Sequence, residues 1–329
     1  MKVRSGLSRR DFLIFAGATI GGLLLISNKA EPKKLLRSVS KNLFQNTQPT
    51  LQARLPTETP PPTEVPENIE VIVTGDVMLG RSVMTTSLDR ADPAYPFRNV
   101  GEVLRGANIV FVNLETPIIS GCPRTDTGMR FCAEPSMVEG LTYAGIDIVT
   151  LANNHTRDYL EEGQIETRNV LRESGIMVTG LGGLETIRVG ETDFGFLGFN
   201  FISSNPTEED FELVRRSSAQ ADVLMVGIHW GGEYRGVPST LQQEWARRIV
   251  ENGADVVVGH HPHWVQNTEY INGKPVYYSL GNFVFDQMWS EETRRGMAVR
   301  LTFQGSTLIS SEELPIYMSS WAQPEFEIP

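Results

Sequence analysis

The sequence predicts an α/β fold with a largely parallel or mixed sheet. Five short runs rich in Val and Ile are apolar almost throughout and then stop in polar residues, at 69–76, 107–115, 146–155, 221–231 and 254–263. Short runs with this composition are typical of strands buried on both faces. Helix-like segments lie between several of these runs, and alternation of strands with helices indicates the α/β class.

The helix-like segments all end in glycine, a residue that suits the position after a helix. They cover residues 97–106, 135–145, 163–175 and 239–253, and end at Gly106, Gly145, Gly175 and Gly253. Two later apolar segments, at 273–287 and 296–313, show no helix-like pattern between them. We expect these later segments to be antiparallel strands.

The first 30 residues have the pattern of a twin-arginine export signal. Arg9 and Arg10 precede Phe12 and Leu13, and about fifteen mostly apolar residues follow. The alternative is an ordinary membrane anchor, and an uncleaved signal would also hold the chain in the membrane. Residues 31–67 contain many Pro and Thr and predict an extended linker. We therefore expect an extracytoplasmic protein.

The distribution of charge makes nucleic acid an unexpected partner. The formal net charge is −11, but residues 1–45 hold nine Lys/Arg against two Asp/Glu, so the remainder carries −18. Nucleic-acid binding needs a basic face, which this acidic body does not provide. An anionic substrate would need a local cationic site, such as a metal ion.

The two cysteines, Cys122 and Cys132, lie in one short segment. In an exported protein we expect them to form a disulfide that closes this loop. A metal-binding pair is the weaker alternative.

Polar side chains follow each of the predicted strands. Ligands gather at the carboxyl ends of strands in open α/β sheets, so these residues should converge on one edge. They are Asp76, Asn113, Glu115, Asn153, Asn154, His155, His229, Glu233, His260, His261 and His263. All five histidines of the chain are among them. Imidazole with carboxylate binds zinc, manganese or iron well, so the set predicts a metal site.

The sharpest element of this set is His261-Pro262-His263, in which two imidazoles flank a stiff proline. Both imidazoles can point at neighbouring metal positions. His260 should then point elsewhere, to a phosphate-like group of a substrate or to a carboxylate that supports the site. A surface turn that merely contains three histidines is the alternative.

Six ordered motifs resemble the bacterial capsule-synthesis CapA family, which includes poly-γ-glutamate synthesis proteins. They are VTGDVMLGR, NLETPI, LANNHTRDY, HWGGEY, GHHPHWVQ and YSLGNFVFDQ, within residues 69–290. The family resembles calcineurin-like metallophosphoesterases. The resemblance implies a four-layer α/β/β/α sandwich with a two-metal centre over residues 68–315, followed by a C-terminal tail at 316–329.

The resemblance also implies roles for individual residues. His155 would protonate a leaving oxygen or stabilise charge, and Glu115 would bridge two metal ions. The implied metal ligands are Asp76, which also acts in catalysis, Glu115, Asn154, His229, His261 and His263. Met78 stands where phosphoesterases usually place a ligand histidine. This departure leaves open whether one metal ion or two are bound.

Three arginines lie next to the motifs and are candidates to contact an anionic substrate together with His260. They are Arg81, Arg157 and Arg235. Guanidinium groups bind carboxylate and phosphate well because they can donate two parallel hydrogen bonds.

These observations favour an exported metal-dependent hydrolase-like protein in capsule or poly-γ-glutamate production. Its substrate would be an anionic polymer or a phosphoester, and membrane capsule-synthase subunits are candidate partners. The first alternative is a non-catalytic assembly factor that binds polymer on the same fold. The second is a phosphoesterase unrelated to capsule.

Overall fold

The structure is a computed structural model and describes residues 68–327, which form fourteen strands, seven α-helices and two short 3-10 helices. The strands are β1 (Ile69–Val77), β2 (Ile109–Leu114), β3 (Ile148–Thr150), β4 (Met177–Thr179), β5 (Glu185–Val189), β6 (Thr192–Asn200), β7 (Val223–His229), β8 (Val256–His260), β9 (Thr268–Ile271), β10 (Lys274–Tyr277), β11 (Asn282–Val284), β12 (Arg295–Gln304), β13 (Thr307–Ser320) and β14 (Gln323–Phe326). The helices are α1 (Arg81–Asp89), α2 (Gly101–Arg105), α3 (Val138–Ala144), α4 (Leu160–Glu173), α5 (Glu208–Ser218), α6 (Thr240–Glu251) and α7 (Glu291–Arg294), with 3-10 turns at Tyr95–Phe97 and Pro135–Met137.

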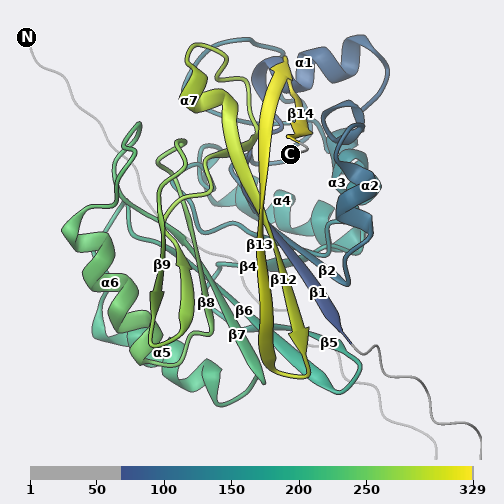
Figure 1. The fold of residues 1–329 in the computed structure, drawn as a ribbon. Helices are drawn as coiled ribbons and strands as arrows, with labels where there is room; N and C mark the ends of the chain where they lie inside the picture. Colours follow the sequence, from purple (N-terminus) through teal and green to yellow (C-terminus); the bar gives the residue numbers. More distant parts are fainter. Residues whose placement is uncertain (1–67, 328–329) are drawn as a thin grey trace, which may run out of the picture. The chain divides into compact units, whose positions relative to one another are not determined.

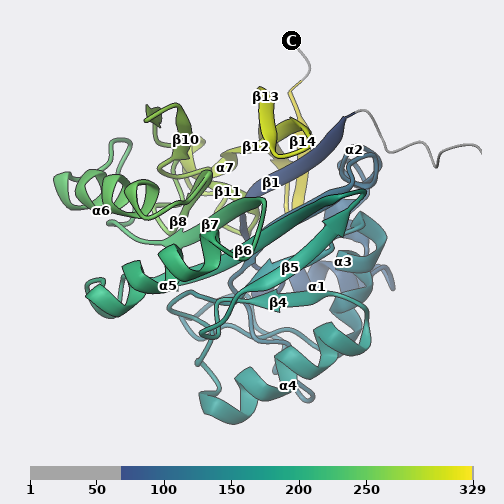
Figure 2. The same ribbon diagram turned by 90° about the horizontal axis from the view of Figure 1, so that it is seen from below.

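The strands form two sheets with helices on both outer sides (Figure 1). The first sheet has the order β14-β13-β12-β1-β2-β3-β4, with β11 also paired to β1, and the second has the order β5-β6-β7-β8-β10-β9. Figure 2 shows α5 and α6 on one side of the sheets, and α1, α3 and α4 on the other. This arrangement confirms the predicted four-layer α/β/β/α sandwich.

Alternation of side chains along the strands fills three apolar layers. Val71 and Val73 of β1 point into the layer between the sheets, while Ile72 between them points to the layer under α1–α4. A third layer joins the second sheet to α5 and α6. Because successive side chains of a strand point to opposite faces, a run such as β1 must be apolar at nearly every position to be buried on both sides.

The pairing aligns the carboxyl ends of the central strands. β1, β2 and β3 are parallel, and Asp76 is paired with Asn113. In the second sheet β7 and β8 are parallel, and His229 is paired with His260. The polar residues of both sheets therefore lie at the carboxyl ends of aligned parallel strands, as the sequence predicted.

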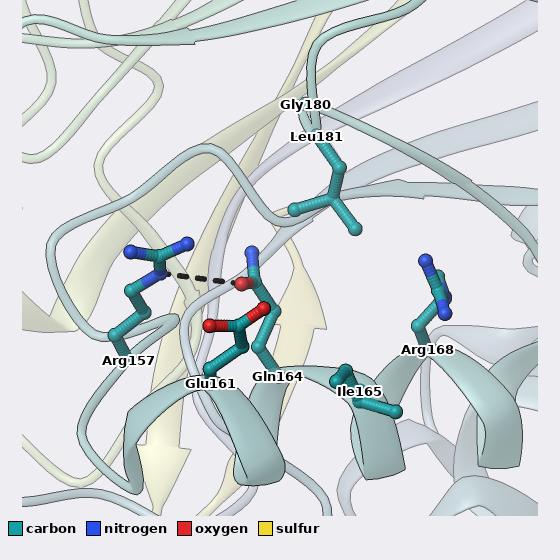
Figure 3. A pocket seen from close by; sticks show the side chains of 7 residues that line it. All are labelled: Arg157, Glu161, Gln164, Ile165, Arg168, Gly180 and Leu181. Atoms are coloured by element: carbon teal, nitrogen blue, oxygen red, sulfur yellow. Dashed lines mark hydrogen bonds between the residues drawn. The ribbon is translucent and has the colours of Figure 1, made fainter.

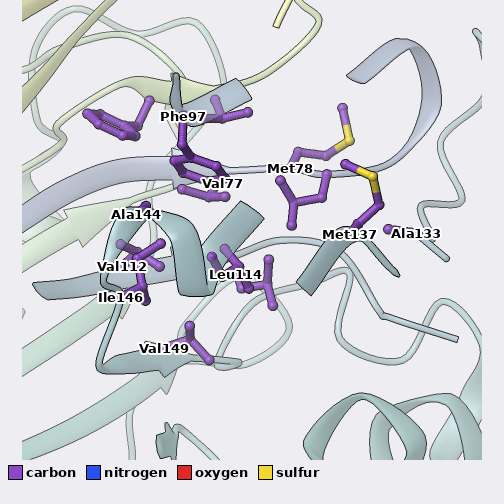
Figure 4. Packing of buried hydrophobic residues seen from close by; sticks show 14 of the residues in the cluster. Val77, Met78, Phe97, Val112, Leu114, Ala133, Met137, Ala144, Ile146 and Val149 are labelled. Atoms are coloured by element: carbon purple, nitrogen blue, oxygen red, sulfur yellow. The ribbon is translucent and has the colours of Figure 1, made fainter. Parts of the chain in front are cut away.

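Met78 is part of the apolar core. It is fully buried in the layer between the first sheet and its helices, in the same cluster as Ala133 and Met137 (Figure 4). Its sulfur accepts a hydrogen bond from the backbone N–H of Gly80 at 3.0 Å. The side chain that replaces the expected histidine thus contributes packing between strand and helices.

Two sequence expectations need correction. The predicted tail at 316–329 is not separate from the domain, because β13 continues to Ser320 and β14 pairs antiparallel with it. Ile316 and Met318 are fully buried there, so alternating apolar side chains extend the sheet beyond residue 315. The segment at 273–287 is not purely antiparallel, because β10 pairs parallel with β8 and β11 pairs parallel with β1, and α7 lies between this segment and β12.

The predicted export signal at 1–30 and the linker at 31–67 lie outside the described residues. Within residues 68–327, no helix has the length and apolar character needed to cross a membrane.

The backbone at Gly75, the residue before Asp76, lies very close to the backbone of Gly281, and this contact leads to a stability prediction. A Cβ on Gly75 would lie 2.1 Å from the carbonyl oxygen of Gly281. That oxygen also accepts the backbone N–H of Asp76 at 2.8 Å, so it is not free to move. We expect Gly75→Ala to lower the free energy of unfolding by about 1–3 kcal/mol or more.

Chemical denaturation measures this change, and Gly183→Ala is the matched control. Gly183 has no atom within 4 Å of a built Cβ, so its substitution should change stability by less than about 0.5 kcal/mol. Equal stability of the two variants would show that the strand junction tolerates a side chain.

Candidate functional site

The predicted polar residues do meet at the strand ends. Asp76 lies at the end of β1, Glu115 follows β2, His229 ends β7 and His260 ends β8. These four residues are at most 2% exposed, and His155, His261 and His263 are also buried. So many polar groups away from water require partners of their own, which the geometry below describes.

The first group of candidate ligands is Asp76, Glu115 and His263, whose ligand atoms all lie within 4.8 Å of one another. Nδ1 of His263 is 3.2 Å from Oδ2 of Asp76. Oε2 of Glu115 is buried and has no hydrogen-bond partner among the described residues. A buried carboxylate oxygen without a donor is costly, and a bound cation would satisfy it.

The second group surrounds Nε2 of His229. This nitrogen lies 2.8 Å from Oδ1 of Asn154, 3.1 Å from Nδ1 of His261 and 3.2 Å from Oε1 of Glu115. Glu115 therefore belongs to both groups, which is the geometry expected of a bridging carboxylate. Imidazole nitrogens, an amide oxygen and carboxylates suit zinc, manganese or iron, so the residues present fit a metal centre.

Three asparagines hold these ligands in place. Asn113 donates from Nδ2 to Oδ1 of Asp76 at 2.9 Å and to Oε1 of Glu115 at 3.3 Å. Asn153 donates to Oδ1 of Asn113 at 3.1 Å, and Oδ1 of Asn282 lies 2.9 Å from Nδ1 of His263. Hydrogen bonds of this kind fix the orientation of metal ligands.

His260 supports Asp76. Its Nδ1 lies 3.0 Å from Oδ1 of Asp76, and the residue is 2% exposed. Its Nε2 is buried without a partner among residues 68–327. Of the two positions expected for His260, the structure therefore shows the one beside a carboxylate.

The turn that carries His261 and His263 has an unusual backbone. Their φ angles are 95° and 57°, in the left-handed region that residues other than glycine seldom adopt. Such strain persists only where the surroundings determine the conformation, and it occurs often at functional sites. Here it lets residues on both sides of Pro262 direct their rings into the same site.

The electrostatics of the two carboxylates differ. Burial raises the pKa of Asp76, but its hydrogen bonds with His260 and His263 outweigh burial and hold that pKa well below the ordinary value. Burial and the charge of Asp76 together raise the pKa of Glu115 well above its ordinary value.

The pKa values of the histidines also shift in opposite directions. Burial lowers the pKa of His263, but the charges of Glu115 and Asp76 outweigh it and raise the pKa to about 9. Burial and the charge of His263 lower the pKa of His261 to about 4. Burial and the charge of His261 also lower the pKa of His229. In the protein without metal, His263 thus carries a proton that balances the charge of Asp76, and the rings of His229 and His261 are neutral.

His155 is held by partners that the sequence did not predict. Its Nδ1 lies 2.8 Å from Oδ2 of Asp158, and its ring stacks on Phe131 with centroids 3.9 Å apart. The backbone N–H of Phe131 donates to the same Asp158 oxygen at 2.6 Å. Phe131 precedes Cys132, which forms a disulfide with Cys122. The disulfide loop therefore packs directly against the candidate catalytic histidine.

The three predicted substrate arginines have different surroundings. Arg81 forms an ion pair with Asp286 and lies over the ring of Phe131, with its side chain only 11% exposed. It therefore braces the disulfide loop. Arg157 and Arg235 are exposed.

With this geometry described, comparison with known proteins decides the family. The family model described as "Bacterial capsule synthesis protein PGA_cap" matches residues 70–188 and 202–287. The chain belongs to this capsule-synthesis family. The matched residues include both candidate ligand groups.

Two relatives agree with this assignment. The chain is 32% identical over 256 residues to the capsule biosynthesis protein CapA of Bacillus anthracis, which covers 68% of the chain and 61% of the relative. It is 30% identical over 241 residues to the PGA biosynthesis protein CapA of Bacillus subtilis, covering 66% and 63% respectively. The matches thus span less than two thirds of these curated relatives.

The fold itself recurs in a solved structure. A hypothetical protein from Thermus thermophilus matches with a TM-score of 0.51 at 17% identity, over 75% of this chain and 98% of that one. This likeness concerns the fold alone.

The pKa of His263 leads to a prediction about metal binding and pH. Since this pKa is about 9 without metal, an ion that binds at His263 must displace a proton below that pH. We expect the apparent affinity for Mn²⁺ or Zn²⁺ to rise at least about tenfold per pH unit between pH 6 and 8, since one displaced proton gives that slope. Competition with a chromophoric chelator measures it, and an affinity independent of pH would contradict the protonated state of His263.

Proposed function

We propose that this member of the capsule-synthesis family is an exported, metal-dependent hydrolase that acts on an anionic polymer such as poly-γ-glutamate. The observation that carries the proposal is the shell of ligands around Glu115, with one of its buried oxygens unpartnered. The relatives named for capsule and PGA biosynthesis support the polymer as the substrate class.

The residues divide into those that hold metal and those that move a proton. Asp76 and His263 would hold one ion, Asn154, His229 and His261 a second, and Glu115 both. When bound, a divalent ion lowers the pKa of a coordinated water and stabilises charge on a substrate oxygen.

His155 is the candidate general acid. Its hydrogen bond to Asp158 occupies Nδ1 and fixes the ring, which leaves Nε2 as the nitrogen that can transfer a proton. The stacked ring of Phe131 restricts rotation of the imidazole. A fixed ring with one free nitrogen is what proton transfer to a leaving group requires.

A binding factor without catalytic activity is the second candidate, and Met78 favours it. Its thioether is buried in the core and replaces a ligand of the first metal position, which leaves three donor residues there. The retained ligands and the ordered His155–Asp158 pair favour an enzyme, because holding polymer alone needs neither a second ligand group nor a fixed proton donor.

The proposal that the protein is exported rests on the sequence of residues 8–28, which contains paired arginines followed by an apolar stretch. The twin-arginine route carries folded proteins, so a metal can be loaded before release. The Pro/Thr-rich linker would then hold the folded domain away from the membrane or wall.

We expect His155→Ala to lower turnover of poly-γ-glutamate, or of a phosphodiester test substrate, at least about 100-fold, because general acid catalysis contributes that much. Metal content should stay unchanged. Turnover is followed by the size distribution of the polymer or by release of the leaving group.

Arg188→Ala is the control, since Arg188 is an exposed partner of Asp193 on the strand hairpin β5–β6. Loss of metal in His155→Ala equal to the loss of turnover would mean that His155 is a ligand. Absence of turnover in the metal-loaded wild-type protein on both substrate classes would favour the binding factor.

A further inference from the structure

A cleft lies beside the candidate catalytic loop, between α4 and the turn at Gly180–Leu181 (Figure 3). Its volume is about 560 Å³, and Arg157, Glu161, Gln164, Ile165 and Arg168 line it from the α4 side. A smaller cavity of about 250 Å³ shares Arg168 and Leu181 with this cleft. The two cavities therefore form one groove along the helix.

The groove is long enough for a chain. Its lining residues on α4 recur at intervals of three and four, from residue 161 to Arg172, so they share one face of the helix. Eleven residues of helix correspond to about 16 Å. A single small anion would occupy a fraction of this length, whereas several repeat units of a polymer would fill it.

Two arginines in the groove lack an acidic partner. Among residues 68–327, neither Arg157 nor Arg168 forms an ion pair, although many exposed arginines of the chain do. Arg157 donates from Nε to Oε1 of Gln164 at 3.2 Å, which orients its guanidinium along the groove (Figure 3). Nε of Arg168 is buried without a partner.

The remaining charges of the groove are nearly balanced. Glu161 is the one acidic side chain that lines the larger cleft. In the smaller cavity Arg172 pairs with Glu185 at 3.1 Å. The net charge of the groove is therefore positive, in a chain whose residues after 45 carry −18. A local cationic site of this kind is what an acidic protein needs to hold an anion.

The groove is joined to the candidate catalytic loop. Arg157 follows His155 by two residues. Gly180 packs so closely on that loop that an added Cβ would lie 2.6 Å from the backbone nitrogen of Ala152. A chain held in the groove would therefore begin beside the segment that carries Asn154 and His155.

We propose that this groove is a binding site for an anionic polymer chain, whose carboxylates are bound by Arg157 and Arg168. The inference rests on the proposed function and deepens it, because it locates the part of the polymer next to the reacting unit. Guanidinium groups suit this task because each can donate two hydrogen bonds to one carboxylate.

The test is binding of fluorescently labelled poly-γ-glutamate to the full chain, measured by anisotropy with and without a metal chelator. We expect the double variant Arg157→Gln/Arg168→Gln to bind at least tenfold more weakly under both conditions, with unchanged metal content and unfolding temperature. Wild-type binding should weaken as NaCl rises, because salt screens exposed charges. Arg188→Gln is the control, and Arg157→Gln alone, at an exposed position, serves if the double variant is unstable.

Wild-type affinity in the double variant would overturn the proposal. Binding that depends on metal but not on these arginines would also overturn it and place the polymer at the metal centre alone. The hydrolase proposal can fail independently of the groove proposal. In that case the wild-type protein shows no turnover, but its binding of polymer still depends on Arg157 and Arg168.

Discussion

Asp76 and Glu115 are two carboxylates buried in one site, and the arrangement around them follows from that constraint. Carboxylates removed from water in close proximity repel one another, and both remain ionised only if positive charge or several donors face them. The structure supplies His260, His263 and the amide of Asn113. These donors come from both sheets, so the site ties the two halves of the sandwich together at their strand ends.

The two buried carboxylates also couple metal binding to loss of the proton on His263. Without metal, the raised pKa of His263 lets its proton balance the charge of Asp76, and the buried, unpartnered oxygen of Glu115 remains a position for a cation. Exchange of that proton for a divalent ion adds one positive charge, which offsets the charge of ionised Glu115 and satisfies its free oxygen. The lowered pKa values of His229 and His261 keep those rings neutral, which is the form that binds metal.

Much of the site was predictable because its residues follow apolar strands, and parallel strands place such residues on one edge. The residues that contact and orient these site residues were not predictable from the sequence. Asp158 lies three residues after His155 and offered a local signal, but Phe131 reaches His155 through a loop whose path depends on the disulfide. Arg81 and its partner Asp286 are 205 residues apart, and no sequence pattern relates them. Strand β6 was also missed, because Gly195 and Gly198 interrupt its apolar run. At Gly198 an added Cβ would meet Oγ1 of Thr150 at 2.2 Å, so packing between the sheets requires the glycine that weakens the strand signal.

The central claim is that a metal centre forms around Glu115, and elemental analysis of the purified full chain tests it most directly. Glu115→Gln keeps the size of the side chain but removes the charge that both ligand groups share. The account predicts at least one tightly bound Mn, Zn or Fe ion per chain in the wild-type protein and a marked loss in Glu115→Gln, with unchanged content in Arg157→Gln. Equal metal content in wild type and Glu115→Gln, or none in either after loading, would contradict it.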